Sequence, residues 1–98
     1  MKGRGAMFKC FVEYRIASEH CSAYTQWMKA RLVDNPHVHL YEGTEQPGLY
    51  VEVWEAATEG AAEQMKKERC DERSAWHEMT CWVPGGPSKV HAWIFRAV

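Results

Sequence analysis

VHAWIFR (residues 90–96) alternates small aliphatic side chains with large aromatic or imidazole ones. Successive side chains of a β-strand point to opposite faces of the sheet. One face of this segment would carry Val90, Ala92 and Ile94, and the other would carry His91, Trp93 and Phe95. Neither face suits bulk water. The pattern therefore predicts a strand in a sheet that has helices on one side and a second apolar partner on the other.

Three further segments read as strands of the same sheet. Residues 8–16 and 49–55 alternate with period two, and residues 37–42 form a shorter strand before a turn-rich connection. The aliphatic sets of these strands are expected to face the helices. The other face would then collect aromatic and charged side chains: Phe11, Glu13, Arg15, His39, Tyr41, Tyr50, Glu52 and Trp54.

Two helices separate the strands. Apolar residues at helical spacing predict one helix up to Val33, capped by Ser18 or Ser22. Thr58 would cap a second helix near 59–70, with Arg69 on its inner side, and Ser74 would cap a further turn or two. The element order is β-α-β-β-α-(α)-β, which predicts the α+β class, with a ferredoxin-like βαββαβ fold and an antiparallel sheet.

The strands at 8–16, 49–55 and 91–95 together resemble those of the dimeric α+β barrel superfamily. This group includes antibiotic-biosynthesis-monooxygenase-like and NIPSNAP-like small proteins. The resemblance is one of pattern, covers roughly residues 7–98 and contains no signature motif. It implies a homodimer whose two sheets enclose a barrel with a cavity in or beside it. Many members are cofactor-independent oxygenases and some bind or degrade haem; no catalytic residue is carried over to this chain.

Length and composition set outer limits. The 98 residues suit a single ferredoxin-like domain at 7–98, with a flexible N-terminal extension at 1–6. The net charge of −1 excludes a strongly basic nucleic-acid-binding surface, and no apolar run is long enough for a membrane span. Without a secretory h-region, the expected compartment is the cytoplasm. The four cysteines lack metal or redox spacing and are expected to be free.

The candidate ligand-binding residues are those that strand alternation turns toward the aromatic face: Glu52, His91, Glu13, Arg15, His39, Tyr50, Trp54 and Trp93. A carboxylate beside an imidazole in an aromatic cavity could act as a general base. The same residues could equally form interface ion pairs. His37 and His39 with Glu52 would make a three-ligand metal site, but the motif is short, so neither a metal nor a cofactor is expected.

Three functions follow from this pattern. The first is a small cytoplasmic homodimer that binds an apolar or aromatic small molecule in its barrel, with no assigned activity. The second is a cofactor-independent monooxygenase-like enzyme, in which Glu13, Glu52 or His91 forms the substrate anion. The third is a purely structural dimerisation module. The expected partners are a second copy, through the sheet face, and this small molecule, but no nucleic acid and no membrane.

Overall fold

The protein has a ferredoxin-like α+β fold. The computed structural model describes residues 7–98, so the extension predicted at residues 1–6 lies outside the described residues. Four strands form one antiparallel sheet in the order β2-β3-β1-β4. Their bounds are β1 (Phe8–Arg15), β2 (Val38–Glu42), β3 (Leu49–Ala56) and β4 (His91–Arg96). The two central strands are therefore β1 and β3, as the ferredoxin-like order predicts.

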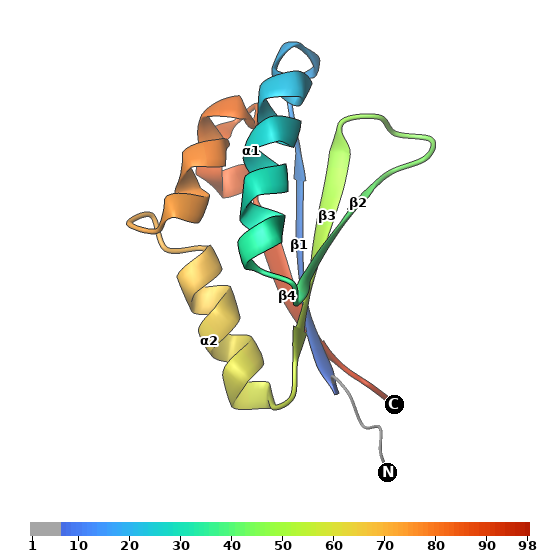
Figure 1. Cartoon of the computed structure of the whole chain (residues 1–98), viewed down its shortest axis with the longest axis vertical. Helices are drawn as coiled ribbons and strands as arrows, with labels where there is room; N and C mark the ends of the chain where they lie inside the picture. The colour runs from blue at the N-terminus through green and yellow to red at the C-terminus, as the bar shows by residue number, and fades with distance from the viewer. Residues whose placement is uncertain (1–6) are drawn as a thin grey trace.

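Both α-helices cover the same side of the sheet (Figure 1). They are α1 (Cys21–Asp34) and α2 (Glu59–Arg69), and they are followed by the 3-10 helices η2 (Ala75–Trp82) and η3 (Gly86–Lys89). Within the described chain, no helix is both long enough and apolar enough to cross a membrane. No helix formed by residues 7–98 covers the opposite side of the sheet, which is called the open face below.

The helix caps agree only partly with the prediction. Thr58 caps α2 by accepting a hydrogen bond from the backbone N–H of Ala61, and Ser74 caps η2 in the same way. The cap predicted for α1 is wrong. A short 3-10 helix, η1 (Ser18–His20), precedes α1. The N-cap residue of α1 is His20, and its side chain makes no cap hydrogen bond.

The strand faces can be read from the register. In β1, Cys10, Val12, Tyr14 and the following Ile16 are buried against the helices, as predicted. In β4, His91, Trp93 and Phe95 lie on the open face, also as predicted, because they pair with the open-face residues of β1.

The face predicted for β3 is wrong. Val12 pairs with Glu52, so Tyr50, Glu52 and Trp54 point toward the helices and are buried. The aliphatic residues Leu49, Val51 and Val53 lie on the open face instead. The helix side takes the larger set because the space there is filled mainly by aromatic rings, among them Tyr24, Trp27, Trp76 and Trp82.

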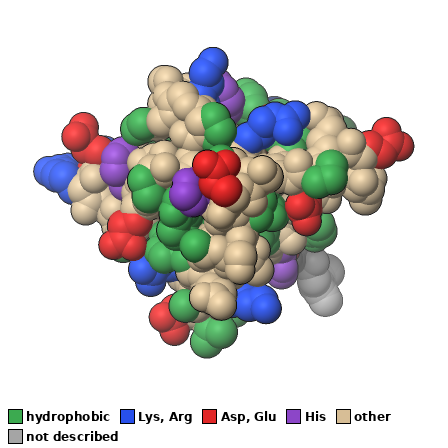
Figure 2. All heavy atoms as spheres, turned by 90° about the horizontal axis from the view of Figure 1, so that it is seen from above, with side chains coloured by type: hydrophobic (Ala, Val, Ile, Leu, Met, Phe, Trp, Pro, Cys, Tyr) green, Lys and Arg blue, Asp and Glu red, His purple; other side chains and the backbone are tan. Residues whose placement is uncertain are grey.

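Surface charge is mixed. Viewed from the end of the longest axis, acidic, basic and apolar side chains are interspersed around the molecule (Figure 2). This distribution agrees with the near-neutral net charge and forms no extended patch of one sign on the face that is shown.

Candidate functional site

A buried ion pair occupies the centre of the space between the sheet and the helices. Glu52 is fully buried, and Arg69 is 2% exposed. Arg69 donates from Nε to Glu52 Oε1 at 2.8 Å and from Nη2 to Glu52 Oε2 at 2.7 Å. This bidentate geometry is the strongest form of a side-chain ion pair. It pairs a carboxylate with a guanidinium inside the core, where either group alone would be costly to bury.

Three aromatic side chains complete this ion pair. Trp54 Nε1 donates to Glu52 Oε1 at 2.8 Å, and the Tyr14 hydroxyl donates to Glu52 Oε2 at 2.5 Å. Tyr14 has a single proton, so in the 2.5 Å contact between the two tyrosine hydroxyls Tyr24 is the donor. These five residues, Tyr14, Tyr24, Glu52, Trp54 and Arg69, are called the Glu52 cluster below.

Burial and charge shift the titration of the Glu52 cluster. Loss of hydration raises the pKa of Tyr14 well above its usual value, and the charge of Glu52 raises it further. Loss of hydration also raises the pKa of Tyr24. For Arg69, burial opposes the charged form, but the hydrogen bonds and charge of Glu52 outweigh it and raise the pKa. The two phenols of the cluster therefore keep their protons, and Arg69 keeps its charge, at neutral pH.

This environment predicts that the fold loses stability in alkaline solution. Burial also raises the pKa of the Cys10 thiol to about 11 from 9.0. Above about pH 9 the unfolded chain would release protons that the folded chain retains, so the free energy of unfolding should fall by up to about 1.4 kcal/mol per pH unit for each such group. Urea unfolding between about pH 7 and 10.5 measures this slope. Tyr14→Phe should flatten the slope above about pH 10, and a constant free energy of unfolding would contradict the expectation.

The Glu52 cluster is unsuited to proton transfer with a substrate. Within residues 7–98, the Glu52 carboxylate accepts hydrogen bonds from buried donors of the core: Tyr14, Trp54 and Arg69. The prediction that Glu52 lies beside His91 on the open face is wrong, because the two residues lie on opposite sides of the sheet. The alternative metal site of His37, His39 and Glu52 is excluded for the same reason, since His39 lies on the open face. Among residues 7–98, no group of three potential metal ligands comes together.

The open face is apolar in its middle and charged toward its ends. Phe11 and Phe95 are in ring contact with centroids 5.1 Å apart, and Trp93 stacks on His91 at 6.0 Å. At one end, Glu55 Oε2 lies 3.2 Å from His39 Nε2 and 3.6 Å from Lys9 Nζ.

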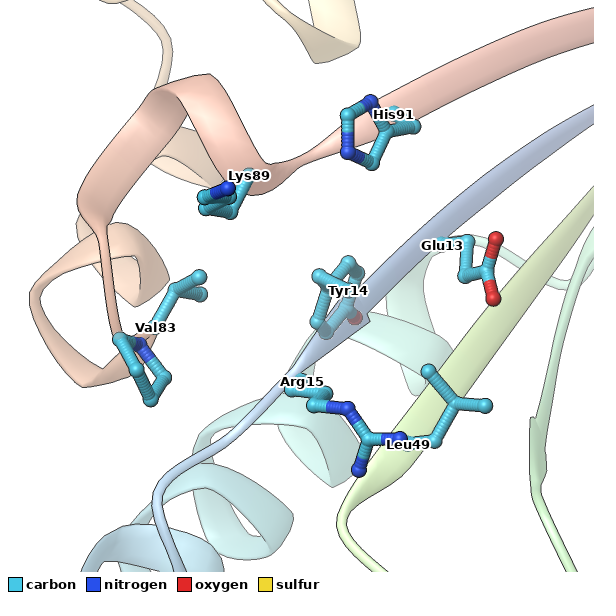
Figure 3. A pocket seen from close by; sticks show the side chains of 8 residues that line it. Glu13, Tyr14, Arg15, Leu49, Val83, Lys89 and His91 are labelled. Atoms are coloured by element: carbon cyan, nitrogen blue, oxygen red, sulfur yellow. The ribbon is translucent and has the colours of Figure 1, made fainter. Parts of the chain in front are cut away.

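A cavity of about 370 Å³ lies at the other end, where β1 ends and β4 begins. We call it the edge cavity; its lining residues are Glu13, Tyr14, Arg15, Leu49, Val83, Pro84, Lys89 and His91. Figure 3 shows Glu13 and Arg15 on β1, Lys89 at the end of η3 and His91 at the start of β4. Glu13 and His91 are direct partners across the β1–β4 ladder.

The structure thus brings together three of the predicted site residues and separates the rest. Glu13, Arg15 and His91 line the edge cavity. Trp93 and His39 lie on the open face outside it, whereas Tyr50, Glu52 and Trp54 belong to the core. Sequence reasoning missed Lys89, because residues 84–87 indicated only a turn and gave no sign that η3 folds back toward the sheet.

Comparisons with known proteins establish the fold. No protein-family model matches the chain, and no curated protein matches it in sequence. Two solved structures share its architecture. One, a conserved protein from Methanosarcina mazei Go1, has a TM-score of 0.66 and 15% identity, over 93% of this chain and 92% of that one.

The second is described as "Putative antibiotic biosynthesis monooxygenase from Nitrosomonas europaea". It has a TM-score of 0.64 and 13% identity, over 100% of this chain and 96% of that one. At such identities the likeness concerns the fold alone. Both structures share the antiparallel α+β architecture of this chain, and as regards the fold they agree with the resemblance drawn from its strands.

Proposed function

We propose that the protein acts as a homodimer, packed open face to open face, that binds a small apolar or aromatic molecule in the edge cavity. The observation that carries this proposal is the open face itself. Trp93 is 44% exposed, Phe95 56% and Tyr41 60% in the single chain. Aromatic side chains gathered on one uncovered sheet face are typical of a surface that is buried by a partner. A second copy presents the same apolar surface and would cover it.

The edge cavity supports the small-molecule part of the proposal. Its volume of about 370 Å³ falls within the usual range of ligand pockets, from about 300 to 1,000 Å³. Leu49, Val83 and Pro84 supply the apolar part of the wall, and the other lining side chains are polar or charged. Polar groups orient a ligand, while contact with the apolar part of the wall provides affinity.

Filling the edge cavity tests this function. Leu49→Trp should weaken the binding of 2-naphthol, a neutral aromatic probe, at least about tenfold, because the indole would occupy the space that the probe needs. Val33→Trp is the matched control, since Val33 is 80% exposed and lies on α1. Binding is measured by isothermal titration calorimetry, and the dimer by sedimentation equilibrium on the same samples. If the dimer forms but binds no probe, the protein is a purely structural dimerisation module.

One observation favours an enzyme as the second candidate. Glu13 faces His91 directly across the ladder at the edge cavity, and either could remove a proton from an activated aromatic substrate. The substrate anion would then react with O₂, its CH₂ group becoming a carbonyl and the second oxygen atom leaving as water. Consumption of O₂ with anthrone, lost in Glu13→Gln with His91→Gln, would support this reaction. Anthrone oxidation at the uncatalysed rate would exclude it for this substrate class.

A further inference from the structure

The charges around the edge cavity are unbalanced. Arg15 and Lys89 are cations, and Glu13 is the single carboxylate among the described residues that line the cavity. Arg15 Nη2 donates to the neutral Gln46 Oε1 at 2.7 Å, which leaves its charge uncompensated. Across residues 7–98, neither Arg15 nor Lys89 makes an ion pair. The two cations stand on different elements, β1 and η3, so they approach the cavity from two sides (Figure 3).

The side chain of Lys89 passes close to Gly85. A Cβ atom at Gly85 would fall 2.6 Å from Lys89 Cγ and 3.2 Å from Lys89 Cε. The lysine stem therefore lies across the turn, in space that only a glycine leaves free. Gly85 also has φ of +91°, a conformation that L side chains rarely adopt. A side chain at position 85 would therefore displace the lysine stem from its place against the turn.

We infer that the molecule bound in the edge cavity carries an anionic group, a carboxylate or an aromatic oxyanion, and that Lys89 is the residue that recognises it. This inference rests on the proposed small-molecule function and names the chemical class of its ligand. The aromatic ring of the ligand would pack against the apolar side chains of the cavity, while Lys89 and Arg15 would bind its anionic group. A charge-assisted hydrogen bond to an anion is about twice as strong as a neutral one, so the preference for an anion should be measurable.

Two probes of the same shape, one charged and one neutral, separate the contribution of the charge to binding from that of the ring. We expect 2-naphthoate to bind the native protein at least about tenfold more tightly than the neutral 2-naphthamide. Lys89→Met should remove this preference: the affinity for 2-naphthoate should fall about tenfold, and the affinity for 2-naphthamide less than about twofold. Lys29→Met, on the exposed surface of α1, is the matched control and should leave both affinities unchanged.

A second pair of variants tests the positioning by Gly85. Gly85→Ala should push the Lys89 stem aside and reduce the preference for 2-naphthoate, with little change in 2-naphthamide binding. Gly60→Ala is the control, because a Cβ at Gly60 meets nothing within 4 Å. Circular dichroism and urea unfolding of both variants verify that the fold persists. A full preference for the carboxylate in folded Gly85→Ala would overturn the positioning role.

The outcomes distinguish the inference from the function on which it rests. If both probes bind equally and Lys89→Met changes neither, the anionic ligand is excluded while the apolar cavity function stands. If neither probe binds the native dimer, the cavity function fails and the inference fails with it. A carboxylate preference that disappears in Lys89→Met but not in Lys29→Met supports both.

Discussion

Arg69→Met is expected to lower the free energy of unfolding by about 3–5 kcal/mol, the usual cost of leaving a buried charge without its partner. Methionine keeps much of the side-chain volume, so the loss reports the missing ion pair rather than a cavity. Glu52 would keep its bonds from Tyr14 and Trp54 but lose both bonds from Arg69. Urea unfolding at neutral pH measures the change.

The control for this prediction is Arg73→Met. Arg73 also pairs with a carboxylate, Asp71, at 3.0 Å, but its side chain is 87% exposed. Exposed ion pairs contribute little because water already solvates both charges, so this variant should unfold like the native protein. A loss below about 1 kcal/mol in Arg69→Met would mean that the core tolerates an unpaired Glu52, contrary to the expected cost.

Trp93→Ala is expected to weaken dimer formation by about 2–4 kcal/mol, or roughly 30- to 1,000-fold in the dissociation constant. Trp93 lies on the open face beside His91, with Phe11 of β1 as its cross-strand partner. Large aromatic residues near the centre of an interface usually carry most of its binding energy. Because Trp93 is 44% exposed in the single chain, its removal should leave the circular dichroism spectrum unchanged.

Sedimentation equilibrium over a range of protein concentrations measures this dissociation constant. Val33→Ala removes an apolar side chain that is 80% exposed on α1, away from the open face, and should not affect this constant. A native protein that sediments as a monomer at micromolar concentration would contradict the homodimer outright. Unchanged association in Trp93→Ala would instead place the interface elsewhere on the surface.

The sequence was sufficient for the fold because its strands and turns are locally unambiguous. The alternation in β1 and β4 predicted the correct faces, since in each case one set of side chains was clearly suited to the helix side. In β3 both sets were largely apolar, so alternation by itself could not decide which set faces the helices. The position of Arg69 decides which face of β3 is turned toward the helices. An arginine on the inner side of α2 requires a buried carboxylate, and Glu52 supplies it.

The candidate site was less predictable than the fold. Glu13, Arg15 and His91 could be placed on one face from strand parity, and all three line the edge cavity. Lys89 could not be found in this way, because its place depends on how η3 folds back after Gly85. Such a position depends on the tertiary packing of a loop, and sequence periodicity does not predict it. The ligand roles of these residues remain predictions.

The Glu52 cluster also affects how the domain can move. Its members come from β1, α1, β3 and α2, so four elements share one set of hydrogen bonds. If α2 opened alone, Arg69 would leave with it and Glu52 would remain stranded in the core. Partial opening at this point therefore costs nearly as much as complete unfolding, and the amides of α2 and the central strands should exchange with solvent as one cooperative unit. Local opening is therefore expected in segments outside the cluster, such as the β2–β3 connection.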